Sequence, residues 1–179
     1  LADHLAPLIP AGSRVLDVGC GDGLLAARIQ ERSPSLQITG LDVLVRDTAA
    51  IPVEGFDGRT LPFADDSIDI VMFVDVLHHA DDPQRLLAEG QRVARQFLVI
   101  KDHLKDGLLA GPTLRFMDWV GNASYGVNLP YHYWTRREWD AEFARLHIEV
   151  DRWLPRLNLY PRPARFLFDR GLHFIARLS

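Results

Sequence analysis

The sequence predicts a doubly wound α/β fold. We expect a mixed sheet of seven strands, five parallel and two in a late antiparallel pair, with helices on both faces. Short runs rich in β-branched residues alternate with helical patterns along the chain, which favours a parallel sheet covered by helices. The chain has 179 residues, 47% hydrophobic and 25% charged, as in an average globular domain. We therefore expect one domain over residues 1–179.

The five parallel strands are expected within the first hundred residues. A short helix over residues 3–9 ends at Pro10 and Gly12 and leads into the first buried strand. The strands are expected at residues 14–18, 37–41, 53–56, 68–74 and 96–100. Helical patterns follow the first strand up to Ser33 and cover residues 83–93, where Pro83 suits a first helical turn.

The chain is less regular beyond residue 101. Thr135 and Glu138 have the spacing of a capping box, so a helix is expected to begin there and to run to about residue 146. Residues 155–165 contain three prolines and are not expected in the centre of the sheet. The remaining expected elements are a helix over 108–120, a loop over 121–126, and an antiparallel strand pair over 147–154 and 171–178.

Charge and cysteine content exclude several classes of function. The net charge of -4 lacks the basic excess typical of nucleic-acid-binding proteins, so no nucleic-acid partner is expected. The longest strongly apolar stretch, residues 68–77, is too short to cross a bilayer, and no membrane span is expected. Cys20 is the single cysteine and no charged-then-apolar leader opens the chain, so we expect a cytoplasmic location. Leu1 in place of methionine suggests that the sequence starts inside a longer gene product.

A glycine-rich turn follows the first expected strand, in the sequence Val15-Leu-Asp-Val-Gly-Cys-Gly-Asp-Gly23. Gly19 and Gly21 let the main chain pass close to a ligand, and the helix behind them directs unpaired N–H groups toward the same space. The turn therefore predicts a small-molecule site, the alternative being a tight turn that holds no ligand.

The spacing of this turn indicates the kind of ligand. A dinucleotide fingerprint requires G-x-G-x-x-G, but Leu24 stands where its third glycine belongs. Asp17 and Asp22 would also repel a pyrophosphate. A ligand with a cationic part and no phosphate suits the turn better.

Further motifs accompany this turn. They are Gly40-Leu-Asp42, Leu61-Pro-Phe63, Asp65-Asp-Ser-Ile-Asp69 and Val76-Leu-His-His-Ala-Asp-Asp-Pro83. With the glycine turn, they make residues 13–103 resemble the class I S-adenosylmethionine-dependent methyltransferases, within the small-molecule branch that includes ubiquinone and menaquinone biosynthesis enzymes. The resemblance implies a Rossmann-like fold, S-adenosyl-L-methionine as cofactor, and methyl transfer to oxygen, nitrogen or carbon of a small organic acceptor. It also implies a single methyltransferase domain with an acceptor-pocket insertion at about residues 104–134, and it allows for a homodimer.

The adenosine end of the cofactor is assigned to residues after the second and third strands. Asp42 at a strand end can accept two hydrogen bonds from a ribose diol, although such an aspartate is often only a turn residue. The resemblance implies that Val43 lies against the adenine. It also implies that the Asp57 carboxylate accepts a bond from the adenine amino group and that the Gly58 N–H serves a ring nitrogen.

The amino-acid end of the cofactor is assigned to the glycine turn. The resemblance implies that Asp17 and the main chain of Gly19, Cys20 and Gly21 face it, and that the backbone near Asp75 closes over it. Cys20 is expected to contribute its main chain and not to act as a nucleophile.

Candidate bases lie at the ends of the fourth and fifth strands, where a doubly wound sheet opens its ligand crevice. His79 and His103 are the candidates, because imidazoles can remove protons at neutral pH. His78 is next to His79, and one ring of this pair is expected to cap or pack. Lys101 could lower the pKa of a bound acceptor, and the alternative is a plain ion pair between Lys101 and Asp102.

Aromatic residues before Thr135 are candidates for the acceptor pocket. Tyr131, His132 and Tyr133 offer stacking faces and polar tips, so they could form its roof. The alternative is that these rings only seal the start of the helix at Thr135.

Several narrower activities do not fit the motifs. The Asn/Asp-Pro-Pro-aromatic run of nucleic-acid amino methyltransferases is replaced by Asp75-Val-Leu-His78. Metal-dependent catechol-type enzymes have an Asp-Asn pair after the fifth strand, where this chain has Asp102-His103, so no metal is expected. Two other interpretations remain open. One is a non-catalytic module that binds S-adenosylmethionine or S-adenosylhomocysteine, and the other is an NAD(P)-dependent oxidoreductase.

Overall fold

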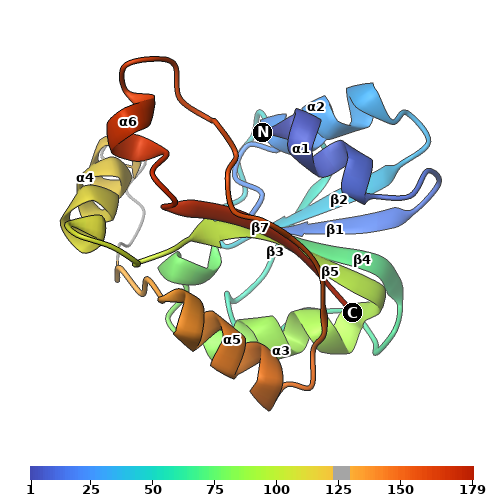
Figure 1. The fold of residues 1–179 in the computed structure, drawn as a ribbon. Coiled ribbons are helices and arrows are strands. Elements are labelled where there is room, and N and C mark those ends of the chain that lie inside the picture. The colour runs from blue at the N-terminus through green and yellow to red at the C-terminus, as the bar shows by residue number, and fades with distance from the viewer. Residues whose placement is uncertain (123–129) are drawn as a thin grey trace.

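A computed structural model describes residues 1–122 and 130–179 of the chain (Figure 1). Its sheet has seven strands in the order β3-β2-β1-β4-β5-β7-β6. The strands are β1 (Arg14–Val18), β2 (Gln37–Asp42), β3 (Val53–Gly55), β4 (Ile68–Val74), β5 (Ala94–His103), β6 (Val150–Leu154) and β7 (His173–Leu178). The first five strands pair in parallel, and β7 runs antiparallel to both β5 and β6. The predicted fold class is confirmed.

Helices cover both faces of the sheet. In Figure 1, α1 and α2 lie on one face, α3 and α5 lie on the other, and α4 and α6 lie together beyond one end. The α-helices are α1 (Ala2–Leu5), α2 (Leu24–Arg32), α3 (Pro83–Val93), α4 (Ala110–Asn122), α5 (Arg136–Arg145) and α6 (Arg165–Phe168), and the 3-10 helices are η1 (Ala6–Leu8) and η2 (Leu77–His79).

Strand β4 shows why the sheet is buried on both faces. Its residues alternate, with Ile70 and Met72 packed into the core beneath α1 and α2, and Val71 and Phe73 into the core beneath α3 and α5. A continuous apolar strand of this kind is typical of a parallel sheet with helices on both sides. Gly90 lets α3 approach the sheet, because a Cβ there would lie 2.5 Å from Cε2 of Phe73.

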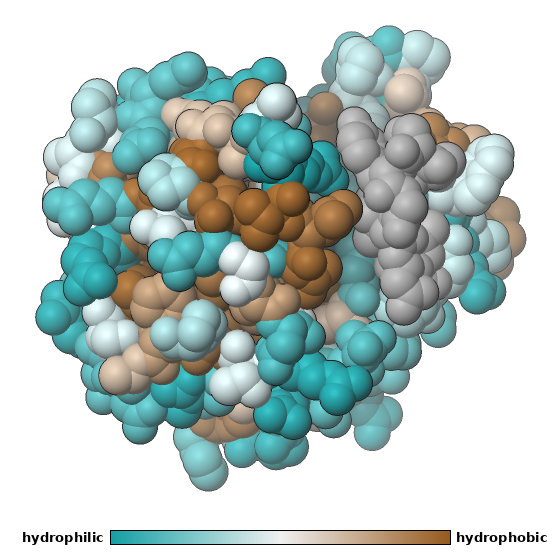
Figure 2. Space-filling model, turned by 180° about the vertical axis from the view of Figure 1, so that it is seen from behind, coloured by the Kyte–Doolittle hydropathy of each residue, from teal (hydrophilic) through white to brown (hydrophobic). Residues whose placement is uncertain are grey.

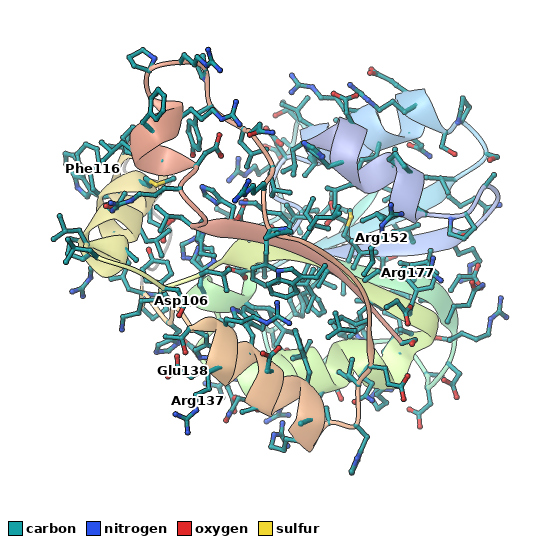
Figure 3. The ribbon with its side chains drawn as sticks, viewed as in Figure 1. Asp106, Phe116, Arg137, Glu138, Arg152 and Arg177 are labelled. Carbon is teal, nitrogen blue, oxygen red and sulfur yellow. The ribbon has the colours of Figure 1, made fainter. Side chains whose placement is uncertain are left out.

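Capping residues set the start of the helices near the site. Thr135 and Glu138 form the predicted capping box, and the Thr135 N–H donates to the Glu138 carboxylate at 2.7 Å. Asp106 accepts the next backbone N–H, from Arg136, at 2.6 Å, so two carboxylates meet the N-terminus of α5 (Figure 3). Carboxylates at the N-terminal end of a helix also interact favourably with the helix dipole. These contacts fix where α5 begins, directly after the aromatic residues 131–134.

The structure differs from the sequence prediction at several element boundaries. Strand β5 runs to His103, three residues beyond the predicted end, so Lys101 and Asp102 belong to the sheet. Helix α4 extends to Asn122 through the start of the predicted loop at 121–126, and the rest of that loop lies outside the described residues. The sequence did not predict η2 or α6. Among the described residues, no helix has the length and apolar composition that a membrane crossing requires.

Candidate cofactor and acceptor site

A cavity of about 580 Å³ opens at the carboxyl ends of β1, β2, β4 and β5. Its walls come from the glycine turn, the loops after β2, β3 and β4, the end of β5, helix α4 and the segment before β7. Lining residues include Gly19, Gly21, Asp42, Val43, Phe56, Gly58, Asp75, His79, Lys101, His103, Met117, Asp118, Tyr160 and His173. Figure 2 shows hydrophobic side chains gathered near the centre of the face opposite to that of Figure 1. The cavity has the size of a small-molecule site.

The glycine turn brings the main chain to the cavity wall. Gly19 and Gly21 have φ values of +71° and +60°, in the left-handed region that glycine adopts without strain. A Cβ on Gly19 would lie 2.5 Å from Cγ2 of Val76, which leaves no room for a side chain. Beside Gly21 the space within 4 Å is open. The turn therefore forms a shallow cradle of backbone, as a cofactor that packs against the main chain requires.

Asp42 is held rigidly at the cavity wall. Its Oδ2 accepts the N–H of Gly21 at 2.7 Å, and its Oδ1 accepts the N–H of Leu44 at 2.9 Å. Each carboxylate oxygen has a second lone pair, so both can still accept a bond from a ligand hydroxyl. Val43 follows Asp42 along the cavity wall and is 67% exposed, leaving a free apolar surface. Together these features fit a nucleoside.

Asp17 and Cys20 lie near Asp42 but outside the cavity lining, Asp17 buried and Cys20 half-buried. Asp17 is 3% exposed, and burial, with a smaller effect of Asp42, raises its pKa to about 7. Burial, together with Asp17 and Asp42, also raises the pKa of the Cys20 thiol to about 12. Neither side chain is among the residues that line the cavity. The neutral thiol agrees with the prediction that Cys20 is not a nucleophile.

Alkylation tests this property of Cys20. At pH 8 we expect iodoacetamide to modify Cys20 at least about a hundredfold more slowly than a free thiol, because the thiolate is the reactive form. Mass spectrometry of the intact protein gives the rate, and the same measurement in denaturant is the control. Equal rates for the folded and the unfolded protein would contradict a half-buried, neutral thiol.

Asp57 is placed differently from Gly58. The Oδ1 atom of Asp57 accepts the N–H groups of Arg59 and Thr60, both at 2.8 Å, and the residue is exposed outside the cavity lining. These two bonds lower the pKa of the Asp57 carboxyl. Gly58, with φ at +75°, does line the cavity. The geometry thus brings Gly58 and the ring of Phe56 to the wall, and leaves Asp57 at its edge.

Asp75 and Lys101 form an ion pair at the floor of the cavity. The Lys101 Nζ atom lies 2.5 Å and 2.7 Å from the two Asp75 oxygens, and the Lys101 side chain is 3% exposed. Burial alone would raise the pKa of Asp75, but the Lys101 charge lowers it below its usual value. The considered pairing of Lys101 with Asp102 is wrong, because adjacent residues of β5 point to opposite faces of the sheet.

Asp102 instead pairs with His78 on η2. The Nδ1 atom of His78 donates to Oδ1 of Asp102 at 2.6 Å, and both side chains are 1% exposed. Oδ2 of Asp118 lies 3.4 Å from Nε2 of His78. Burial would lower the pKa of His78, but the two carboxylates raise it to about 10. His78 is therefore the packed ring of the predicted pair.

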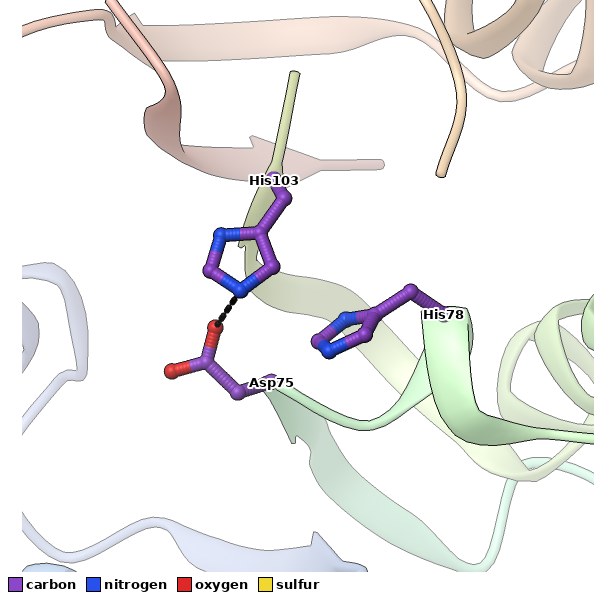
Figure 4. Close-up of side chains that lie close together, drawn as sticks. All are labelled: Asp75, His78 and His103. Carbon is purple, nitrogen blue, oxygen red and sulfur yellow. Dashed lines mark ion pairs between the residues drawn. The ribbon is translucent and has the colours of Figure 1, made fainter. Parts of the chain in front are cut away.

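His79 and His103 both reach the cavity. Burial and the neighbouring His78 lower the pKa of His79 to about 4. The Nε2 atom of His103 lies 3.6 Å from Oδ1 of Asp75 (Figure 4). The same atom lies 3.7 Å from Oδ1 of Asp118. Asp75, His78 and His103 place ligand atoms within 4.8 Å of one another, as a metal site would. The ammonium group of Lys101 on Asp75 opposes a cation there, so ion pairs account for this cluster.

The predicted roof residues lie outside the cavity lining. Tyr133 is buried, and its hydroxyl donates to Asp118, while Tyr131 is half-buried and His132 is exposed. Tyr133 therefore fixes Asp118, consistent with a supporting role.

The structure adds cavity residues that the sequence analysis missed, above all Asp118 on α4 and His173 at the start of β7. A lone carboxylate in the apolar helix pattern of residues 108–120 was a signal for Asp118. His173 had no comparable signal, because it depends on the pairing of β7 with β5.

Known proteins match this chain over different lengths. A family model described as Methyltransferase domain matches residues 16–97. The curated 27-O-demethylrifamycin SV methyltransferase of Amycolatopsis mediterranei is 30% identical over 110 residues, which are 53% of this chain and 40% of that protein. The chain thus spans less than half the length of this relative.

Solved structures extend the likeness to the whole chain. A SAM-dependent methyltransferase from Aquifex aeolicus has a TM-score of 0.66 at 16% identity, covering 99% of this chain and 88% of the other. The [4+2]-cyclase SpnF has a TM-score of 0.72 at 17% identity, covering 99% of this chain and 79% of the other. At such low identity these structures support the fold and carry no information on the reaction. The family match over residues 16–97 and the fold together make this chain similar to S-adenosylmethionine-dependent methyltransferases.

Proposed function

We propose that the chain transfers the methyl group of S-adenosylmethionine to oxygen, nitrogen or carbon of a small organic molecule. The observation that carries this proposal is the Asp42 carboxylate, fixed by two backbone N–H groups beside a glycine turn that offers bare main chain to the cavity. When bound, S-adenosylmethionine supplies a methyl group on an already activated leaving group. The protein must then mainly align the acceptor, which can contribute roughly 7–11 kcal/mol.

The proposed cofactor residues fall into two groups. Asp42 would hold the ribose hydroxyls, and Val43 and Gly58 would contact the adenine. The main chain of Gly19 and Gly21 would contact the amino-acid end. Asp17, the Cys20 main chain and Asp57 complete the proposed set, Asp17 and Cys20 from behind the turn and Asp57 from the edge of the cavity.

The acceptor is proposed to bind at the opposite end of the cavity. Lys101, His79 and His103 line the cavity and would form this end, and Asp75 would lie between them and the glycine turn. Among the family branches, we propose the small-molecule branch similar to the ubiquinone and menaquinone biosynthesis enzymes. A cavity of about 580 Å³ supports a small acceptor beside the cofactor.

Calorimetry with S-adenosylhomocysteine tests the proposal. We expect the unchanged protein to bind it and Asp42→Ala to weaken binding by about 10- to 100-fold, because one or two hydrogen bonds to a charged acceptor are lost. Since Asp42 also holds Gly21 and Leu44, Asp42→Asn, which keeps one acceptor oxygen, should lose less affinity.

Asp47→Ala is the matched control, because Asp47 is exposed in the same loop and outside the cavity lining. It should bind as tightly as the unchanged protein. Absence of binding to the folded, unchanged protein would refute the cofactor assignment. Equal affinity for Asp42→Ala and Asp47→Ala would refute the role of Asp42 alone.

A further inference from the structure

His103 and His173 face each other across the last parallel strand and its antiparallel neighbour. They are register partners on β5 and β7, and their Nδ1 atoms lie 3.0 Å apart. Their rings are tilted by 60° with centroids 4.9 Å apart, which suits an in-plane hydrogen bond better than stacking. His173 is 2% exposed and His103 is 6% exposed, so bulk water competes little with this bond. One nitrogen must donate and the other must accept.

The surroundings of His173 decide which nitrogen donates. Its Nε2 lies 3.0 Å from the carbonyl oxygen of Phe168, which can only accept, so Nε2 carries a proton. The Lys101 ammonium group, which can only donate, lies 3.5 Å from Nδ1 of His173. Burial and the Lys101 charge lower the pKa of His173 to about 3, so the ring is neutral. Nδ1 of His173 is therefore an acceptor.

The tautomer of His103 follows from that of His173. The Nδ1 atom of His103 must carry the proton that is donated to His173. Nε2 is therefore the only nitrogen of this ring that can exchange a proton with a ligand. The charged or titratable groups that face the His103 ring come from every neighbouring element. They are Asp75 after β4, His78 on η2, Asp118 on α4, Tyr133 before α5, and His173 on β7.

We infer that His173 is a positioning residue that fixes His103 as the Nδ1–H tautomer, so that Nε2 of His103 accepts the proton of an acceptor hydroxyl group in the cavity. The inference rests on the methyltransferase function proposed above, and it narrows the acceptor to a group that must lose a proton. Its basis is the chain of contacts from the Phe168 carbonyl through His173 to His103.

The proton balance of the transfer agrees with these contacts. The acceptor oxygen forms a bond to the methyl carbon, the carbon–sulfur bond breaks, and its electron pair stays on sulfur. The hydroxyl proton goes to Nε2 of His103. The imidazolium ion formed there is stabilised by Asp75 at 3.6 Å and Asp118 at 3.7 Å.

The same reasoning favours His103 over His79 as the base. The pKa of His79, about 4, makes it a poor proton acceptor at neutral pH. No carbonyl or carboxylate contact fixes its tautomer among the described residues, and its Nδ1 is buried without a hydrogen-bond partner. His103 has both an oriented ring and two carboxylates near its Nε2 atom.

Nuclear magnetic resonance of ¹⁵N-labelled protein tests this inference without any acceptor. Long-range ¹H–¹⁵N spectra distinguish a protonated from an unprotonated ring nitrogen, and His103→Gln identifies the His103 signals. In the unchanged protein, we expect the neutral ring of His103 to carry its proton on Nδ1, with Nε2 bare. His173→Phe should abolish this preference. His173→Asn should retain it, because its side-chain oxygen can replace the lost acceptor.

His147→Asn is the control, since His147 is exposed and outside the cavity lining; it should leave the His103 spectrum unchanged. A neutral His103 with its proton on Nε2, in the unchanged protein, would overturn the inference. So would an unchanged His103 tautomer in folded His173→Phe. Calorimetry with S-adenosylhomocysteine on the same samples separates the two proposals: lost binding in the unchanged protein refutes the function, whereas normal binding with the wrong tautomer refutes only the role of His173.

Discussion

Replacing Asp102 by alanine is expected to lower the free energy of unfolding by about 3–5 kcal/mol, because it removes one partner of a fully buried ion pair. The pair joins Asp102 and His78 at 2.6 Å, and both side chains are 1% exposed. The same Oδ1 atom also accepts the backbone N–H of His103 at 2.7 Å, so a second buried donor loses its partner. Denaturation in urea at neutral pH measures the loss.

Two variants control this experiment. Asp102→Asn preserves the shape and one acceptor oxygen, so it should lose clearly less stability than Asp102→Ala. Asp140→Ala breaks an exposed pair with Arg136, four residues apart on α5, and should change stability by no more than about 0.5 kcal/mol. A loss below about 1 kcal/mol for Asp102→Ala would mean that the buried pair contributes no more than a surface pair.

The pH dependence of stability gives an independent check on the same pair. The pKa of His78 is raised to about 10 in the folded protein, so its contribution is complete below the unfolded pKa of about 6.5 and is lost as the pH rises toward 10. For Asp102, burial opposes but His78 lowers the pKa, so its contribution is lost as the pH falls below about 4. The fall in stability above about pH 6.5 should be smaller in Asp102→Ala than in the unchanged protein.

The sheet and the residues proposed to hold the cofactor could be predicted from local sequence. Strands β1, β4 and β7 carry their own apolar patterns, and the glycine turn and Asp42 are short motifs at strand ends. Such features depend on residues close together in the chain, and they reach the cavity because parallel strands all end at the same edge. The placement of Gly19, Gly21 and Asp42 on one wall therefore followed from their position after β1 and β2.

The residues around the proposed acceptor end could not be predicted in this way, because their contacts join segments that are distant in the sequence. His103 meets His173 through the register of β5 with β7, which are separated by about 70 residues and by α4, α5 and β6. Asp118 reaches His78 from α4, and no local pattern sets that distance. Asp57 shows a second limit of prediction from local sequence. The motif predicted that its carboxylate contacts the adenine, but in the structure this carboxylate accepts the N–H groups of Arg59 and Thr60. Local turn geometry competes with ligand contact for the same oxygen.

Substitution of the glycine turn should have the largest effect on cofactor binding. Gly19→Ala and Gly21→Ala both force a non-glycine residue into the left-handed region, at a cost of about 1–2 kcal/mol. At Gly19 the new Cβ also meets Val76 at 2.5 Å, and overpacking adds about 1–3 kcal/mol, so this variant should be the less stable of the two. At Gly21 the new methyl group meets no protein atom within 4 Å and instead extends beside the cavity.

Gly12→Ala is the control that distinguishes the effect of backbone strain from an effect on ligand binding. Gly12 has φ at +80°, a new Cβ there meets no atom within 4 Å, and the residue lies outside the cavity lining. We expect Gly12→Ala and Gly21→Ala to lose similar stability in urea. Only Gly21→Ala should lose affinity for S-adenosylhomocysteine, by at least about tenfold, which corresponds to about 1.4 kcal/mol. If both variants bound the ligand as tightly as the unchanged protein, the open space beside Gly21 would not be where the cofactor approaches the main chain. Similar stability with divergent affinity would show that the affinity is lost at the cavity wall, through the new methyl group or through the bond from the Gly21 N–H to Asp42. This comparison therefore tests the cradle without relying on the fold's resemblance to known methyltransferases.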